Sequence, residues 1–493
     1  MPIIQELSDS EDESATTSSS PIDLKTASSI LHDTLTTLHT PTPSLEARYN
    51  TILHNLLPLS TFLQTQPSSI TSFQPQLLQL LRPHPQLQPR LNYGFDDASY
   101  DASPALPHYH TLSTKLLKLL SSCESFLDSS DRELITTLAA FNSPEDPWTT
   151  ATSQQLARGL LDTILGDEKG KGELYTPILR DVIKPLFSRT PSTSRITPAG
   201  RLAIRENSNN RIDTAPPLWL TERPEVVGVL EFILETIPAA QIEANWGLIV
   251  PPVLTLMDNT ITSVKTRAVG MISTLLRRLE EEEGTRTLLK RTGLGTVFWD
   301  AVLATLSYLP PLTPVPESVM LLKAGYGCLI QLAKAREKEL KKRALLLDAV
   351  VREGFLRGMR FADKFMDVVV VLVESLREVV TEMGVYFVKH LKSVVPVLGD
   401  LLADPFGDAN LLLLGVVIKT TEVVVENCWM RMESYRGEIL RGTAEGGEVE
   451  RVRNGLRGLV RVVKATVREE EWGLIEEGIR GVDEKVFGGL FEA

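Results

Sequence analysis

The chain has 493 residues, of which 43% are apolar and 6% are aromatic. This length allows two or three domains or one long repeat array, and few aromatic side chains are typical of helical repeats packed with Leu, Val and Ala. The formal net charge of -12 repels phosphate backbones, so we expect no nucleic-acid partner.

The apolar runs and the cysteines indicate a soluble intracellular protein. Runs such as Leu411–Ile418 are shorter than the ~20 residues that cross a bilayer, and residues 1–13 lack the basic and apolar regions of a signal peptide. Cys123, Cys328 and Cys428 are too few and too far apart for a disulfide framework. We therefore expect a reducing compartment and no membrane partner.

The first third of the chain is predicted to be irregular. Residues 1–20 are acidic and Ser-rich, so we expect a disordered tip. Residues 21–146 follow as an irregular helical region, with helices over Ile30–Leu38, Ser44–Leu57 and His110–Leu127. Residues 74–107 are dense in Pro, which lacks a backbone N–H and interrupts helices. This segment is therefore predicted to be a loop.

Residues 147–493 are predicted to form HEAT-like helical repeats. Apolar side chains recur at helical spacing over Val226–Ile237, Val264–Leu279, Met366–Val380 and Val452–Val467. The run Val368–Val371 has strand propensity, but the helical spacing continues beyond it, which favours a buried helix. Residues 188–217 are polar and Pro-rich, and they are predicted to be a loop that interrupts the repeats.

Two segments resemble each other and indicate the type of repeat. Each has a proline-marked apolar helix, then a short polar turn, then a second apolar helix; the first helices contain Pro251 and Pro396, and Gly270 and Gly415 follow at the same offset. Such pairs cannot bury their apolar faces alone and stack on one another. We therefore predict an all-α, HEAT/armadillo-like helical-repeat solenoid.

The common signatures of catalysis and cofactor binding are missing. There is no phosphate loop and no nucleophile elbow, and no Cys/His cluster has the spacing of zinc ligands. Gly293-Leu-Gly295 begins like a dinucleotide fingerprint, but Phe298 replaces the third glycine, so a turn between helices is the favoured interpretation. We predict no catalytic residue, no cofactor and no metal site.

The basic segment Ala333–Ala344 is a candidate localisation signal. Its lysines and arginines are interleaved with Glu337 and Glu339, which favours a solvated helix. A nuclear localisation signal is the alternative. The protein is expected in the cytoplasm, and in the nucleus as well if this segment is such a signal.

Five motifs follow one another between Pro147 and Leu332. They are Ile196-Thr-Pro198-Ala-Gly-Arg201, Pro217-Leu-Trp219, Trp246-Gly-Leu-Ile-Val-Pro251-Pro252-Val-Leu-Thr-Leu-Met-Asp258, Leu288-Leu-Lys-Arg-Thr-Gly293-Leu and Leu309-Pro310-Pro311-Leu. In this order and spacing the chain resembles the Tel-two-interacting protein two family, more weakly as far as Cys428. The first 140 or so residues contribute nothing to the resemblance.

The resemblance implies a non-catalytic scaffold subunit of the Triple-T co-chaperone complex. In that complex the subunit pairs with Tel-two and Tel-two-interacting protein one, which are larger helical-repeat proteins. Together they deliver new phosphatidylinositol-3-kinase-related kinases to Hsp90 and its adaptors. Two alternatives remain open, a HEAT-type adaptor in nuclear transport or trafficking and an enzyme without a familiar signature. A pull-down from native lysate separates them by the partners that it recovers.

The residues that carry the resemblance are also the candidate partner contacts. They are Trp246, Pro251, Pro252, Asp258, Gly293, Pro310 and Pro311. Several of these positions look like turns, where packing alone need not dictate the residue. The simpler interpretations are that Trp246 belongs to the core, that Asp258 caps the next helix, and that the double prolines only start or end helices.

The acidic tip contains two candidate phosphorylation sites. Ser8 and Ser10 each have a glutamate three residues later, which is the pattern that an acidophilic kinase of the casein-kinase-two type reads. The run Asp9-Ser10-Glu11-Asp12 also resembles the acidic phosphoserine motif recognised by PIH-type adaptor domains, which pair phosphate with Lys and Arg. The alternative is a tail that only keeps the protein soluble.

A peptide of residues 4–16 tests the phosphorylation hypothesis. Phosphate on Ser10 adds about -1.5 to -2 charge and three acceptor oxygens, so we expect the phosphopeptide to bind a purified PIH domain more tightly than the unmodified peptide. A titration that finds equally weak binding of both peptides would leave the tip as a charged tail.

Overall fold

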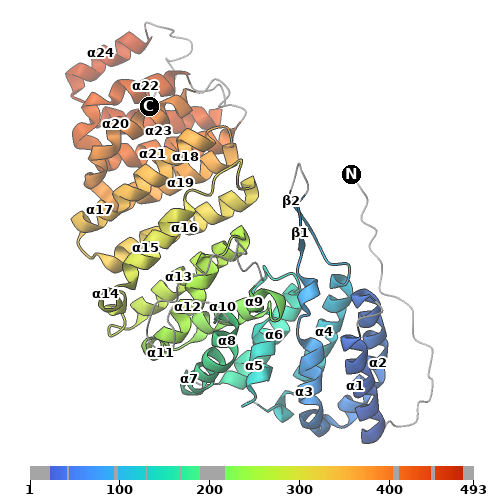
Figure 1. The fold of residues 1–493 in the computed structure, drawn as a ribbon. Helices are drawn as coiled ribbons and strands as arrows, with labels where there is room; N and C mark the ends of the chain where they lie inside the picture. Colours follow the sequence, from blue (N-terminus) through green and yellow to red (C-terminus); the bar gives the residue numbers. More distant parts are fainter. Residues whose placement is uncertain are drawn as a thin grey trace, which may run out of the picture. The chain divides into compact units, whose positions relative to one another are not determined.

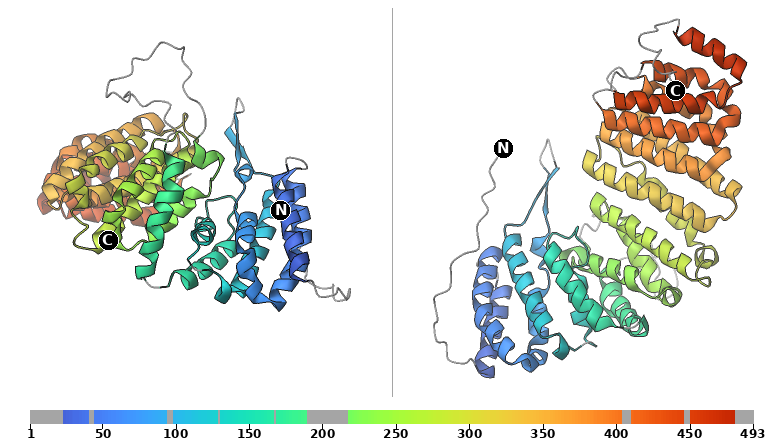
Figure 2. Two further views of the ribbon diagram at one scale, coloured as in Figure 1. Left: turned by 60° about the horizontal axis from the view of Figure 1, so that its bottom comes forward. Right: turned by 180° about the vertical axis from the view of Figure 1, so that it is seen from behind.

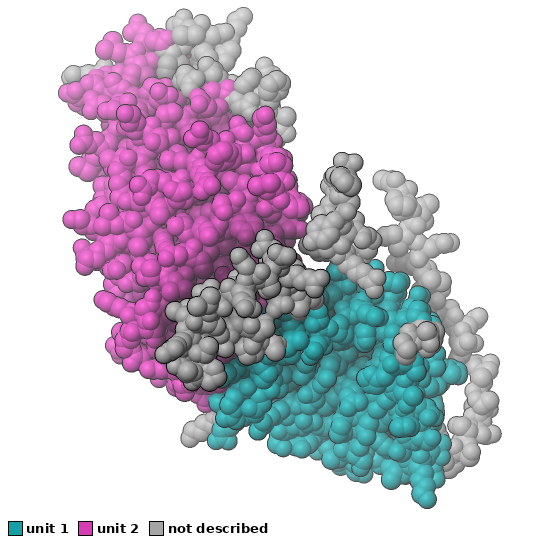
Figure 3. All heavy atoms as spheres, in the orientation of Figure 1, with its two compact units in different colours: residues 1–236 teal, residues 237–493 magenta. Residues whose placement is uncertain are grey.

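The computed structural model describes residues 23–40, 44–93, 98–128, 130–166, 168–188, 217–403, 410–445 and 450–480. Most of these residues lie in helices (Figure 1). The chain divides into two compact units, Met1–Thr236 and Ile237–Ala493 (Figure 3). The acidic tip and residues 189–216 of the polar loop lie outside the described residues. The sequence analysis places the start of the regular repeats at residue 147. This is not a boundary between compact units, and it stays a prediction.

The first unit stacks helical pairs in two layers. The pairs are α1 (Leu24–His39) with α2 (Leu45–Thr65), α3 (Ile70–Leu81) with α4 (Leu106–Ser122), and α5 (Arg132–Ala139) with α6 (Ala151–Leu165). The helices α1, α3 and α5 pack side by side, and so do α2, α4 and α6. The side chains of Asp23 and Thr150 cap α1 and α6 by accepting from backbone N–H groups, which satisfies donors that the helix leaves unpaired.

The remaining helices of the first unit extend this stack. They are α7 (Glu168–Pro177), the π-helical segment η4 (Ile178–Ile183), α8 (Lys184–Phe187), α9 (Leu218–Thr221) and α10 (Val226–Thr236). Helix α10 packs against α5 and η4. Just before α10, the buried carboxylate of Glu225 accepts from Arg223 Nε at 2.9 Å, while Glu133 of α5 pairs with Arg82 and Arg223. These ion pairs join the ends of α3, α5 and α10.

The loop predicted for residues 74–107 is wrong at both ends. Helix α3 runs through Pro75 to Leu81. Proline has no N–H to donate to the carbonyl of Thr71, one turn earlier. The helix tolerates this loss because Thr71 lies on the exposed side of the helix, where water can donate instead. The strands β1 (Arg90–Tyr93) and β2 (Ala98–Asp101) then form an antiparallel hairpin with Leu91 opposite Tyr100, which the absence of a longer alternating pattern concealed.

The second unit consists of five helical pairs within its described residues. They are α12 (Trp246–Met257) with α13 (Thr262–Glu281), α15 (Leu294–Thr305) with α16 (Val315–Arg336), α17 (Leu340–Ala349), η5 (Val350–Leu356) and α18 (Arg357–Ala362) with α19 (Met366–Met383), α20 (Leu391–Leu402) with α21 (Leu411–Cys428), and α22 (Arg436–Glu445) with α23 (Glu450–Lys464). Shorter elements are α11 (Ala239–Ala244), α14 (Leu288–Thr292), η6 (Gly384–His390), η8 (Trp429–Ser434) and α24 (Glu469–Arg480).

The second helices of these pairs, α13, α16, α19, α21 and α23, pack side by side as one layer (Figures 1 and 2). Helices α16, α19 and α21 run parallel, because residues at their ends meet. Lys334 of α16 pairs with Glu382 of α19 at 2.7 Å, and a Cβ at Gly384, directly after α19, would lie 4.0 Å from Asn427 Oδ1 near the end of α21. We call the side of the unit where these helices end the carboxyl edge, and the side where they begin the amino edge.

Helix α19 confirms the prediction of a buried helix over Val368–Val371. All four valines are buried, because α19 packs against α16 and α21 within its layer and against α17, η5 and α18 in the other layer. The predicted all-α helical-repeat solenoid is therefore confirmed, with one short hairpin added. The two similar segments of the sequence are the pairs α12/α13 and α20/α21.

Close packing between the layers depends on glycine. A Cβ at Gly354 of η5 would lie 2.5 Å from Tyr326 Oη and 2.8 Å from Leu306 Cδ1, whereas a Cβ at Gly327 of α16 would meet no atom within 4 Å. Both Tyr326 and Leu306 are buried, so neither can move aside freely. Gly354 is thus a contact point between neighbouring pairs.

We expect Gly354→Ala to lower the free energy of unfolding by about 1–3 kcal/mol, the usual result of overpacking a core. Gly327→Ala is the matched control, and it is expected to raise this free energy slightly, by up to ~1 kcal/mol, because Ala favours a helix interior. Urea unfolding followed by circular dichroism measures both. Identical midpoints for Gly354→Ala and the parent chain would contradict the close contact.

Candidate partner-binding surface

Nucleophilic and metal-binding groups are not gathered anywhere in the described residues. No group of three or more His, Cys, Asp or Glu side chains is placed to hold a metal ion in this part of the chain. Cys123, Cys328 and Cys428 are buried, and burial raises the pKa of the Cys328 and Cys428 thiols to about 12. Of the helices that the structure describes, none is both long and apolar enough to span a membrane.

Two of the seven predicted contacts lie at the carboxyl edge. Trp246 begins α12, and Gly293 has a φ of 70° in the turn between α14 and α15, where a left-handed conformation favours glycine. Arg291 Nη2 of α14 contacts Glu243 Oε1 of α11 at 2.6 Å, which brings the two turns together. Trp246 is only half-buried, so it does not belong fully to the core.

Three other predicted contacts lie at the amino edge. Asp258 follows the end of α12, and Pro310 and Pro311 follow α15. The ammonium of Lys265, in the first turn of α13, lies 5.3 Å from the ring centre of Tyr308, so these two turns are also neighbours. Because α12 has 12 residues, the two edges are ~18 Å apart along it. The seven residues therefore do not form one surface.

Two local predictions for these residues are wrong. Pro251 and Pro252 lie inside α12 rather than at its ends, and the Pro251 carbonyl accepts from Thr255 Oγ1 at 2.9 Å. Asp258 does not cap α13; instead the side chain of Asn259 accepts from the backbone N–H of Ile261 at 2.8 Å. The sequence could not settle either point, because a helix tolerates proline where the carbonyls that lose a donor reach water.

Four large side chains at the carboxyl edge form a surface that the sequence analysis missed. Trp429 and Met430 of η8 are 59% and 67% exposed, and Val385 and Tyr386 of η6 are 50% and 37% exposed. We call these four residues the turn cluster. The available signal was Trp429-Met430 directly after a long apolar helix, where a polar turn would be expected.

The two turns of this cluster are neighbours in space. The segment η6 follows α19 and η8 follows α21, and these two helices pack side by side. Gly384, with a φ of 54°, begins η6 so close to α21 that a Cβ there would lie 4.0 Å from Asn427 Oδ1. Asn427 is two residues before Trp429, so the four apolar side chains belong to adjoining turns.

Charged pairs connect η6 and the end of α19 to the preceding helices. Asp348 of α17 accepts from Lys389 Nζ at 2.5 Å and contacts His390 Nε2 at 2.8 Å, which holds η6 in place. Glu382 at the end of α19 contacts both Lys334 and Arg343 at 2.7 Å. The basic segment Ala333–Ala344 is therefore not one helix, since α16 ends at Arg336 and α17 begins at Leu340, and part of its charge is neutralised.

Burial sets the protonation of His390. Desolvation lowers the pKa of its imidazole from the ordinary value of 6.5, although the hydrogen bond to Asp348 acts in the opposite direction. The native imidazole is thus neutral at pH 7 and donates to the carboxylate. This keeps η6 anchored without placing a buried cation beside the exposed ammonium of Lys389.

Comparison with known proteins gives one family and a group of helical-repeat structures. Residues 134–409, more than half of the chain, match the model of the Tti2 family. The karyopherin Kap121p bound to the extreme C-terminus of the protein phosphatase Cdc14p matches 89% of this chain with a TM-score of 0.48 and 13% identity. Kap121p alone matches 88% with a TM-score of 0.48 and 12% identity. This chain spans 38% of the length of each of these two chains.

We expect the stability of the protein to fall as the pH is lowered below 6.5, in part because of His390. The unfolded imidazole takes up a proton near its ordinary pKa, whereas the native one resists protonation, so stability is lost between 6.5 and the lower native pKa. Unfolding at pH 7.5 and 5.5 measures this loss, and His390→Gln should show a smaller one. An equal loss in both proteins would assign it to other groups.

Proposed function

The chain belongs to the Tti2 family, and on this premise we propose that it is a non-catalytic scaffold subunit of a Triple-T co-chaperone complex. Its partners in this proposal are a Tel-two-like and a Tel-two-interacting-protein-one-like helical-repeat protein. Through them it supports the maturation of phosphatidylinositol-3-kinase-related kinases with Hsp90, in the cytoplasm and in the nucleus. The stacked helical pairs support this role, because such arrays present long surfaces to other proteins.

The observation that carries the proposal is the exposure of Trp429 in the turn cluster. The other tryptophans, Trp148, Trp219, Trp246, Trp299 and Trp472, are buried or half-buried. A large aromatic side chain that is exposed beside a second apolar turn is typical of a protein-binding site, and Trp, Tyr and Met are enriched at the centres of interfaces. We therefore propose the turn cluster as the main partner contact.

The carboxyl edge extends this surface along the second unit. Trp246 and Gly293 lie on the same edge, and Leu345 within α17, the helix that begins there, is 60% exposed. A partner helix laid along the edge would contact the turns of successive pairs. Of the seven contacts expected from the sequence, this proposal keeps Trp246 and Gly293 as part of the main surface.

The amino edge is the competing surface. Its exposed apolar side chains include Leu312, Phe361, Met366 and Leu412, and Asp258, Pro310 and Pro311 lie there. It offers no exposed Trp or Tyr among its described residues. Leu411 and Leu412 follow Asn410, and the residues before it, 404–409, lie outside the described residues, so the chain next to this surface is described in part only. We therefore place the main contact at the carboxyl edge.

An adaptor in nuclear transport is the alternative function, and the charge pairs count against it. Contact with acidic cargo through Ala333–Ala344 would compete with Glu382, which already pairs with Lys334 and Arg343. Lys342 likewise pairs with Glu339 at 2.9 Å. Only part of the basic segment is left for an outside partner.

A pair of variants with equal exposure tests the proposed contact. Met430 and Leu412 are both 67% exposed and lie near opposite ends of α21. We expect Trp429→Ala with Met430→Ala to weaken binding of the two helical-repeat partners by about 30-fold or more, the cost of truncating an interface centre. Leu412→Ala is expected to leave binding unchanged, as measured by titration of the purified partners.

The opposite result would move the contact to the amino edge. If Leu412→Ala weakens binding and the double variant does not, the turn cluster is not the partner surface. Circular dichroism of both variants must match the parent chain, which we expect because neither position is buried.

A further inference from the structure

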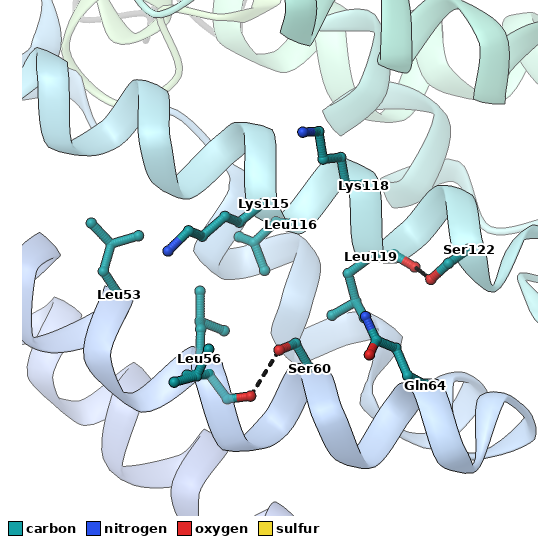
Figure 4. A pocket seen from close by; sticks show the side chains of 10 residues that line it. Leu53, Leu56, Ser60, Gln64, Lys115, Leu116, Lys118, Leu119 and Ser122 are labelled. Carbon is teal, nitrogen blue, oxygen red and sulfur yellow. Dashed lines mark hydrogen bonds between the residues drawn. The ribbon is translucent and has the colours of Figure 1, made fainter. Parts of the chain in front are cut away.

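The first unit contains a groove that the partner surface does not use. It lies between α2 and α4, the second helices of the first two pairs, and encloses about 270 Å³ (Figure 4). Leu53, Leu56 and Leu57 of α2 and Leu116 and Leu119 of α4 make its apolar floor. Leu57 is 67% exposed there, so a large apolar side chain faces water in the absence of an occupant.

The rim of the groove is cationic. Lys115 and Lys118 of α4 line it, and no Asp or Glu belongs to its lining. Both ammonium groups are exposed, and neither has an ion pair with any residue that the structure describes. In a chain with a net charge of -12, a basic rim over an apolar floor selects an occupant that combines apolar side chains with carboxylates.

The floor has the spacing of a helix-binding groove. On α2 the leucines follow one another at intervals of three and one residues, and Ser60 and Gln64 continue the same face. On α4, Leu116 and Leu119 are three residues apart. Two parallel rows of this kind accept a short segment with apolar residues at i and i+4.

The N-terminal segment of this chain has the complementary pattern. After Met1 and Pro2, its apolar residues before Asp9 are Ile3, Ile4 and Leu7, and Ile3 and Leu7 are four residues apart. An acidic run follows at once and contains Asp9, Glu11, Asp12 and Glu13. The segment therefore presents an apolar face and then a cluster of carboxylates, in an order that matches the floor and the rim.

The connection to the fold is short enough for binding within one chain. Asp23 caps the start of α1, and α1 runs antiparallel to α2, since Arg48 Nη1 near the start of α2 donates to the Leu38 carbonyl near the end of α1 at 2.7 Å. Asp23 therefore lies toward the end of α2 that carries Gln64. The 16 residues from Leu7 to Asp23 reach ~50 Å when extended, and the floor from Leu53 to Gln64 is ~17 Å long.

We propose that the N-terminal segment, residues 1–22, binds in the groove between α2 and α4 of its own chain. Ile3, Ile4 and Leu7 cover the leucine floor, and the carboxylates of residues 9–13 pair with Lys115 and Lys118. The segment thereby covers Leu57 and closes the groove to other amphipathic segments.

Zero-length carbodiimide cross-linking of the full chain tests this placement. The reagent joins a carboxylate to an amine in contact with it, and peptide mass spectrometry locates the amide bond. We expect residues 9–13 to be joined mainly to Lys115 and Lys118. Lys25 and Lys184, which are also exposed in the first unit, serve as controls. Equal coupling to all four lysines would overturn the proposal.

Two neutral substitutions test whether the leucine floor is needed. Leu57→Gln and Leu7→Gln remove an apolar contact without changing the charge, and we expect each to reduce the cross-links to Lys115 and Lys118 by about tenfold. Leu24→Gln is the matched control on α1, where the side chain is 52% exposed. Undiminished cross-linking in Leu57→Gln would show that charge alone attracts the segment, and would overturn binding in the groove.

A mixture of unlabelled and nitrogen-15-labelled protein identifies the occupant. Cross-links within one isotope class support binding within the chain. Cross-links that join labelled to unlabelled peptides would instead assign the groove to a second copy. No cross-link from residues 9–13 to either rim lysine, under conditions where those lysines react with a soluble carboxylate, would leave the groove to a different protein and refute the proposal.

Discussion

The fold depends on covering the second helix of each pair from both sides. In α19 the consecutive residues Val368–Val371 are all buried, so that turn of the helix has no side that faces water. A helix that is apolar all round is stable only between neighbours. Each pair therefore needs the next one, and the stack continues along the chain. The packing that holds the stack together also covers most of the apolar faces of the helices. Several of the exposed apolar side chains in the second unit therefore lie in the turns.

Function follows from what happens at those turns. At the carboxyl edge, Asp348 holds η6 through Lys389 and His390, and Glu382 joins α16, α17 and α19. These pairs fix the backbone that carries Tyr386, beside the turn of Trp429, so a partner would not need to order that part of the surface on binding, which lowers the entropic cost of association. Anchored turns with exposed aromatic side chains are suited to a scaffold, because the protein contributes a rigid surface rather than a reactive group.

Helical periodicity made the helices predictable, but it could not show where their ends meet. The spacing of apolar residues was sufficient for α13, α19 and the two proline-marked pairs. Five of the seven residues of the resemblance lie on two edges because helices alternate in direction, and the sequence does not show which turns share an edge; Pro251 and Pro252 lie within α12. Trp429 was missed because periodicity does not show which side chains in a turn stay exposed. Pro75 misled the prediction, since it occupies a helix at a point where proline can be accommodated.

Two proposed binding sites compete for the N-terminal segment. Its carboxylates can pair with Lys115 and Lys118, and the same run around Ser10 is the motif that a basic adaptor domain would read. One segment cannot occupy both sites, so binding in the groove would reduce the apparent affinity for an adaptor in proportion to the fraction of chains in which the segment is bound. Phosphate on Ser8 or Ser10 strengthens attraction to either set of cations. The site that forms more direct hydrogen bonds to the phosphate oxygens then binds the segment more tightly. Two lysines on one helix form fewer such bonds than a pocket built from several basic residues, so phosphorylation favours the adaptor.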